Sequence, residues 1–176
     1  SERLREIVQD VFEISRAASG QLPLKMERLD LGKLLRQTLA DRKDTIEETS
    51  FQLRVNLPEE EVMVLADGQR MYRVFANLIE NALKYSLEGS RIFLTLKKED
   101  GKVEVRIQNT SKEELKEGKD FTERFVRGDE SRTDGGSGLG LSIAKSFTEA
   151  CGGDFHVETA GDSFTVIVAF PEDGER

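Results

Sequence analysis

The chain has 176 residues, of which 37% are hydrophobic and 34% charged, and it carries a formal net charge of −8, one cysteine, three prolines and one histidine. This composition predicts a folded chain of roughly one domain and excludes a disulfide framework or a zinc site with several cysteine and histidine ligands. The negative charge argues against nucleic-acid binding, and no apolar run reaches the ~18–20 residues of a membrane span. We therefore expect a cytoplasmic globular chain, and because it begins without a methionine, part of a longer protein.

The first predicted element is an amphipathic helix over residues 1–19, which Gly20 would end. Its apolar residues recur at alternating steps of three and four, the spacing of a helical bundle seam. The residues at these steps are Leu4, Ile7, Val11, Ile14 and Ala18. Such a seam suits packing on the same domain or pairing in a dimer, and the sequence leaves both open.

Hydrophobic alternation, capping residues and turn residues predict the elements beyond Gly20. The expected strands cover residues 22–31, 51–56, 62–66, 91–98, 102–108, 155–159 and 163–170. The expected helices cover residues 31–48, 67–85 and 139–150. Together they predict an α+β fold, a two-layer α/β sandwich in which helices cover one face of a mixed, mostly antiparallel sheet. We expect a separable helical segment over residues 1–20 and a second domain over residues 21–176.

The helix predicted over residues 67–85 carries an unusual polar face. At 100° per residue, Asn77, Asn81 and Lys84 lie together opposite the apolar side, and two arginines (70 and 73) are close by. Asparagine is a mediocre helix former, so two of them one turn apart are costly unless a ligand uses them. An amide oxygen suits Mg²⁺, and a lysine offers a point charge for phosphate. An ordinary solvated face is the alternative.

Glycines cluster before the last predicted helix, at positions 128, 135, 136, 138 and 140. Glycine lets backbone amides approach phosphate, and a helix N-terminus favours anions. The run matches neither the Walker A sequence nor the dinucleotide-binding fingerprint. We expect a lid over a phosphate site, with a plain hinge as the alternative.

Residues 112–135 predict a long polar loop, which in a compact domain is usually functional. Phe121 and Phe125 would anchor this loop to the body of the domain. Arg124 and Arg127 could then reach phosphate or acidic side chains.

Three segments together resemble the ATP-binding domain of sensor histidine kinases, in the superfamily shared with gyrase and Hsp90. They are residues 77–86 (the N box of that family), 121–127 (its F box) and 136–143 (its second glycine box). They follow the family's order at compatible distances, and the likeness covers about residues 22–171. The helix over residues 1–19 is similar to the second half of the family's dimerisation and phosphoacceptor hairpin.

The resemblance implies an ATP- and Mg²⁺-dependent protein-histidine kinase. By this likeness, Asn81 would bind Mg²⁺, Asn77 would help hold metal or water, and Lys84 would contact a phosphate. Tyr85 would flank the adenine, and Arg127 would lie near the γ-phosphate. The further nucleotide-binding positions implied are Gly136, Ser137, Gly138, Leu139, Gly140 and Leu141.

The implied reaction moves the γ-phosphoryl group of ATP to a histidine outside this chain, for relay to an aspartate of a response regulator. The implied partners are ATP, the phosphoacceptor helix of the parent kinase, a response regulator, and a second parent molecule paired through the helical hairpin. Thr165, in the last strand, could reach the adenine side or could be a plain strand residue.

Two departures from the family pattern matter. Asn109 stands where the family's first glycine box has an aspartate, and both glycines of that box are missing. An asparagine still accepts a hydrogen bond from the adenine amine, but an uncharged one, a loss on the order of 1 kcal/mol. No acceptor histidine is visible, since His156 falls in a predicted strand. Cys151 is expected to be a small buried hydrophobe.

Other functions also fit this pattern of residues. The missing glycines suit a non-catalytic nucleotide-sensing or dimerisation module with a degenerate ATP site. A serine-phosphorylating anti-sigma factor uses the same fold, but the first helix and residues 121–127 argue against it. A gyrase-type ATPase is disfavoured because Asn77 stands where those enzymes place a glutamate base.

Overall fold

The computed structural model describes residues 1–115, 121 and 138–174. Its helices are α1 (Glu2–Ala18), α2 (Leu31–Asp41), α3 (Lys43–Glu47), α4 (Gly68–Tyr85) and α6 (Gly140–Ala150). Its strands are β1 (Met26–Asp30), β2 (Gln52–Asn56), β3 (Met63–Asp67), β4 (Arg91–Glu99), β5 (Lys102–Thr110), β6 (Asp154–Ala160) and β7 (Ser163–Pro171). Within these ranges, no helix combines the length and apolar character that crossing a bilayer requires.

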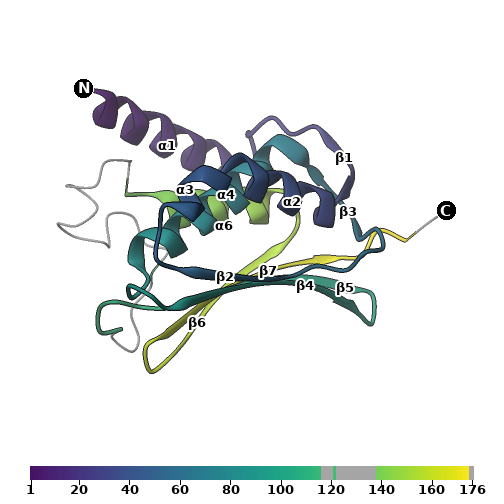
Figure 1. Cartoon of the computed structure of the whole chain (residues 1–176). Helices are drawn as coiled ribbons and strands as arrows, with labels where there is room; N and C mark the ends of the chain where they lie inside the picture. The colour runs from purple at the N-terminus through teal and green to yellow at the C-terminus, as the bar shows by residue number, and fades with distance from the viewer. Residues whose placement is uncertain (116–120, 122–137, 175–176) are drawn as a thin grey trace.

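The strands form two sheets. Five of them lie in the order β2-β4-β5-β7-β6, and only the β2–β4 pair is parallel. The helices lie over one face of this large sheet (Figure 1). The predicted α+β sandwich with a mixed, mostly antiparallel sheet is therefore confirmed.

The second sheet was not anticipated. β3 pairs antiparallel with β1, the strand that follows α1, and takes no part in the large sheet. β2 and β3 are consecutive strands joined by a short turn, yet they lie in different sheets. Alternation of apolar residues reveals a strand but does not identify its partner.

The core lies between the large sheet and the helices. Strand side chains alternate as expected for a sheet with one buried face, so that Ile92, Leu94 and Leu96 of β4 point inward. Phe75 of α4 and Phe147 of α6 are fully buried against them. Each such side chain contributes roughly 1.5–3 kcal/mol when removed from water.

The single helix predicted over residues 31–48 is wrong, because the chain breaks at Arg42 into α2 and α3. The Arg42 guanidinium donates to the hydroxyl of Tyr72 on α4 at 3.0 Å and lies 3.4 Å from the carboxylate of Glu80. The Tyr72 hydroxyl in turn donates to Asp41 at 2.6 Å, and with Gln37 it lowers the pKa of that carboxyl. Tertiary contacts to α4 therefore accompany the end of α2.

The predicted first helix exists, and one side of it packs on the domain. Ile14 of α1 is 4% exposed and belongs to the core. Two buried carboxylates hold the helix to α4: Glu13 lies 3.0 Å from Arg70, and Asp10 lies 2.7 Å from Arg73. Both arginines share the helix face of the asparagines, as expected, and their guanidinium groups are engaged by α1.

Another side of α1 is exposed. Leu4, Val8 and Phe12 are 59%, 61% and 53% exposed and recur every four residues. The helix thus combines packing on its own domain with an apolar stripe available to a partner. The division into segments 1–20 and 21–176 stays a prediction.

Candidate nucleotide-binding site

Asp67 fixes the start and the rotation of α4. Its carboxylate accepts hydrogen bonds from the backbone N–H of Arg70 at 3.1 Å and of Lys25 at 2.7 Å. Burial alone would raise the pKa of Asp67, but these backbone hydrogen bonds outweigh it and lower the pKa. With the helix anchored in this way, Met71, Phe75 and the other apolar residues turn to the core, and the asparagines turn away from it.

The polar face of α4 is half-buried along its length: Asn77, Asn81, Lys84 and Tyr85 are all neither fully exposed nor fully buried. At 1.5 Å per residue, Asn77 and Tyr85 are about 12 Å apart along the helix axis. The Lys84 ammonium lies 5.5 Å from the centre of the Tyr85 ring. Glu80 turns the other way, toward Arg42, and is therefore not part of this face.

The start of α6 meets α4 at Asn77. The Asn77 side-chain amide donates to the backbone carbonyl of Gly140 at 3.3 Å, and a Cβ placed on Gly140 would lie 3.9 Å from Asn77 Cγ. Gly138 has φ +76°, which glycine adopts readily. Leu139 occupies the N-cap position and has no side-chain oxygen to accept from the amides of the first turn. These features give a helix N-terminus suited to an anion beside an asparagine.

The far end of α4 is joined to the end of β5. The carbonyl of Tyr85 accepts from the N–H of Lys112 at 3.0 Å, and the N–H of Leu87 donates to the carbonyl of Thr110 at 2.8 Å. These bonds hold Lys84 and Tyr85 close to Asn109, which is 5% exposed. The sequence-predicted phosphate end and adenine end therefore lie along one helix face.

Phe121 contacts the body of the domain. Its ring meets the ring of Phe164 edge-on, with 5.1 Å between the centroids. Phe164 is the β7 residue directly opposite Asn109 in the register of β5 and β7, so both side chains lie on the same sheet face. Sequence reasoning missed Phe164 because it looks like any other core residue of its strand.

Thr165 is not brought to this site. It lies opposite Gln108, and neighbouring strand residues point to opposite faces, so Thr165 is on the sheet face away from Asn109 and the helices. The expectation that its hydroxyl reaches the adenine side is corrected accordingly. Leu141 is 3% exposed and belongs to the core, so its side chain packs inside the domain.

Several predicted positions lie outside the described residues. Among them are Arg124, Phe125, Arg127, Gly128, Gly135, Gly136 and Ser137. Of the remaining candidates, Cys151 is buried as expected, and burial raises the pKa of its thiol. His156 lies in β6 with its side chain 65% exposed. It therefore does not lie on a helix, where the family's phosphoacceptor histidine is expected.

A divalent cation could be held here by few protein ligands. In the described part of the chain, no cluster of three histidine, cysteine or acidic residues could form a metal cage. Asn81 and Asn77 offer neutral amide oxygens, and because Asn77 uses its amide nitrogen for Gly140, its oxygen is left as the acceptor. Mg²⁺ is usually bound by one or two protein oxygens together with substrate phosphates and water, so these residues fit it.

The domain is a two-layer sandwich. The face of α4 that carries Asn77 and Asn81 meets the N-terminus of α6. This arrangement is typical of a nucleotide-binding domain. A family described as histidine kinase-, DNA gyrase B- and HSP90-like ATPases matches residues 66–174. The chain belongs to this family of ATPases.

Similar proteins are sensor histidine kinases. The chain is 34% identical to the sensor protein VanSC of Enterococcus gallinarum over 176 residues, covering 98% of this chain and 48% of VanSC. Full-length ShkA in complex with AMPPNP superposes with a TM-score of 0.79 at 25% identity, covering 98% of this chain and 36% of ShkA. The histidine kinase ThkA in complex with the response regulator TrrA gives 0.75 at 23% identity, covering 98% and 48%. The chain thus covers about half or less of each of these three proteins.

Proposed function

We propose that this chain is the ATP- and Mg²⁺-binding catalytic part of a sensor histidine kinase, which transfers the γ-phosphoryl group of ATP to a histidine outside the chain. The observation that carries this proposal is the contact between Asn77 and Gly140. It brings the N box and the second glycine box together, although 63 residues separate them in sequence. Neither motif alone forms a triphosphate site.

In the proposed reaction, the domain promotes phosphoryl transfer mainly by positioning ATP and neutralising the charge of its phosphates. The amide oxygens of Asn81 and Asn77 would hold Mg²⁺, and Lys84 one turn further along would contact a phosphate. The N-terminus of α6 would bind phosphate oxygens through its backbone amides. Bound Mg²⁺ would neutralise phosphate charge and orient the transferring group.

Asn109 and Tyr85 would hold the adenine. Asn109 is buried at the end of β5, where its amide oxygen can accept from an adenine amine. Tyr85 sits at the end of α4, tied by its carbonyl to Lys112, and would flank the ring. Arg127, Gly136 and Ser137 would complete the phosphate contacts, as the family resemblance implies.

The proposed partners follow from the relatives and from α1. The exposed stripe formed by Leu4, Val8 and Phe12 would pair with a second parent molecule in a helical bundle. The phosphoacceptor helix of the parent would receive the phosphoryl group, and a response regulator would accept it next. ThkA in complex with the response regulator TrrA supports this last step by analogy. We also propose a cytoplasmic location, where a response regulator would be reached.

A second candidate is a nucleotide-sensing module without transfer activity. Asn109 favours it, because an uncharged acceptor replaces the family aspartate and the two following glycines are absent. Both candidates require nucleotide binding, and only the first requires phosphoryl transfer.

Calorimetric titration with AMPPNP, with and without Mg²⁺, tests the site itself. We expect saturable binding that weakens by about tenfold or more in Asn81→Ala, as for loss of one ligand to a charged group. Asn56→Ala is the matched control, because Asn56 is an exposed asparagine at the end of β2. If Asn81→Ala and the unmutated chain bind AMPPNP with equal affinity in the presence of Mg²⁺, the proposed role of Asn81 is refuted.

A further inference from the structure

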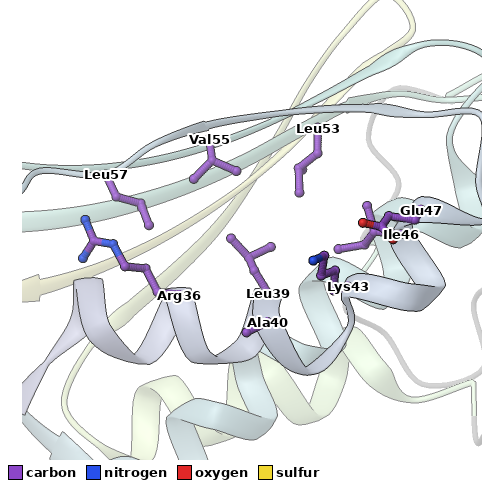
Figure 2. A pocket seen from close by; sticks show the side chains of 9 residues that line it. All are labelled: Arg36, Leu39, Ala40, Lys43, Ile46, Glu47, Leu53, Val55 and Leu57. Carbon is purple, nitrogen blue, oxygen red and sulfur yellow. The ribbon is translucent and has the colours of Figure 1, made fainter.

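An apolar groove of about 620 Å³ lies between the edge of the large sheet and the α2–α3 helices, away from the nucleotide site. Its lining is mostly aliphatic, and Figure 2 shows the side chains of the strand and those of the helices facing one another. The apolar lining residues are Leu39, Ala40, Ile46, Leu53, Val55 and Leu57. Arg36, Lys43 and Glu47 add charge to its rim.

The groove lies beside a free strand edge. β2 pairs with β4 on one side, and among the described residues no strand pairs with its other side. The N–H of Gln52 donates toward β4, at Ser90, so in a parallel pair the N–H groups of Leu53 and Val55 point to the free edge. Val55 is 44% exposed. Such an edge is a template for another strand.

A strand added at this edge would direct every second side chain over the outer lip of the groove. That lip is formed by Arg36, Ala40 and Lys43 of α2 and the start of α3. Arg36 and Ala40 are four residues apart on α2, about 6 Å along the helix, which is close to the ~6.7 Å between alternate residues of a strand. Lys43 is the first residue of α3, just beyond the break at Arg42. The lip therefore carries a small residue, Ala40, with a basic residue on each side of it.

The two basic residues are available to an incoming acid. The Arg36 guanidinium donates to the carbonyl of Pro58 at 2.8 Å, which holds it at the Leu57 end of the groove. Neither Arg36 nor Lys43 forms an ion pair with any residue whose position is described, although Glu47 lies in the same lining. A guanidinium held by one backbone carbonyl keeps donors free for a carboxylate.

We propose that this groove binds an extended peptide segment of a partner protein, which adds as a strand to the free edge of β2. The segment carries an apolar residue over Ala40, facing Leu53 and Val55, and an acidic residue two positions to each side, facing Arg36 and Lys43. The pattern is acidic-x-apolar-x-acidic. Main-chain hydrogen bonds to β2 supply affinity, and the alternate side chains supply specificity.

The groove is separate from the nucleotide site. None of its lining residues lies on α4, which carries the asparagines and Lys84. Peptide binding is therefore expected with or without nucleotide, and it can fail without affecting the assignment as an ATPase.

The test uses a fluorescein-labelled peptide of sequence Ser-Asp-Thr-Leu-Thr-Glu-Ser and the whole chain, followed by fluorescence anisotropy. We expect saturable binding that falls by about tenfold or more in Arg36→Glu with Lys43→Glu. Lys97→Glu combined with Lys102→Glu, an equal charge change on exposed residues of β4 and β5, is the matched control and should bind like the unmutated chain. Val55→Pro keeps an apolar side chain in the groove but removes an N–H from the free edge, and should also weaken binding by about tenfold.

Backbone amide resonances locate the bound peptide. Shifts concentrated at β2 and α2 support binding at this edge. No saturable binding, or binding that the charge reversals and Val55→Pro leave unchanged, overturns the inference. A chain that dimerises through β2 and excludes the peptide also overturns it, since the occupant would then be a second copy.

Discussion

The side-chain amide of Asn77 donates a hydrogen bond to the backbone carbonyl of Gly140 across 3.3 Å. This bond joins the middle of α4 to the first residue of α6, and it fixes the glycine-bearing helix start relative to the asparagine face. It also orients the Asn77 amide, because the nitrogen is engaged and the oxygen is left to accept.

Alanine substitutions at Gly138 and Gly140, the two glycines of the second glycine box that the structure describes, should have different effects on stability and on nucleotide binding. Gly140→Ala places a methyl group at ordinary contact distance from Asn77 Cγ, 3.9 Å, so the fold tolerates it and helix propensity raises the free energy of unfolding by up to about 1 kcal/mol. The same methyl narrows the space above Asn77, and nucleotide affinity should fall. Gly138→Ala should lower the free energy of unfolding by about 1 kcal/mol, because φ is +76° there. Urea denaturation measures both, and a destabilised Gly140→Ala would contradict the packing described.

Asn109→Asp should bind ATP several-fold more tightly than the parent. A carboxylate accepts from the adenine amine through a charge-assisted hydrogen bond, which is stronger by about 1 kcal/mol. Because Asn109 is 5% exposed, the carboxylate should also lower the stability of the nucleotide-free chain. Calorimetry and thermal unfolding measure the two effects. A marked drop in ATP affinity would be incompatible with an adenine contact at this position.

The ion pair between Arg73 and Asp10 should contribute to holding α1 on the domain. Asp10 is buried, so Arg73→Ala leaves its carboxylate without a partner 2.7 Å away and should cost about 1–3 kcal/mol of unfolding free energy. Asp10→Asn combined with Arg73→Ala should recover part of that cost. The control is Arg5→Ala, whose ion pair with Glu2 spans 3.9 Å between side chains more than 80% exposed and should contribute almost nothing. Equal effects of Arg73→Ala and Arg5→Ala would show that the buried pair does not anchor the helix.

Asp67 should make stability depend on acid pH. Its pKa is lowered in the folded state, so its contribution is fully present above the ordinary aspartate pKa of about 3.9 and is lost as pH falls through the lower folded value. Asp67→Asn still offers an oxygen for capping but removes this titration. The stability difference between parent and variant should therefore be larger at pH 7 than at pH 3. A difference independent of pH would mean that the folded and unfolded pKa values are equal.

Local chemistry determined the elements that sequence reasoning identified correctly. The turn between β4 and β5 is Asp100-Gly101, and both residues have positive φ, 54° and 77°, as a two-residue hairpin turn requires. The cap at Asp67 set the start of α4, and helical spacing brought Asn77, Asn81 and Lys84 to one face. These inferences depend on neighbours within a few residues, which the sequence displays.

The errors came from long-range contacts. Arg70 and Arg73 lie near the asparagines as expected, but the sequence did not reveal that carboxylates of α1, about 60 residues earlier, pair with them. Arg42 ends α2 in contact with Tyr72 and Glu80 of another helix. The pairing of β5 with β7 places Phe164, and not Thr165, opposite Asn109, and one residue along a strand is enough to turn a side chain to the other face.

Phosphoryl transfer tests the central claim most directly. The chain would be incubated with Mg²⁺ and ATP labelled at the γ-phosphate, together with the phosphoacceptor helix of its parent kinase supplied as a separate polypeptide. We predict acid-labile label on that helix, none on the chain itself, and loss of transfer in Asn81→Ala but not in Asn56→Ala. Tight nucleotide binding with no label on the helix, or transfer that persists in Asn81→Ala, would contradict the account.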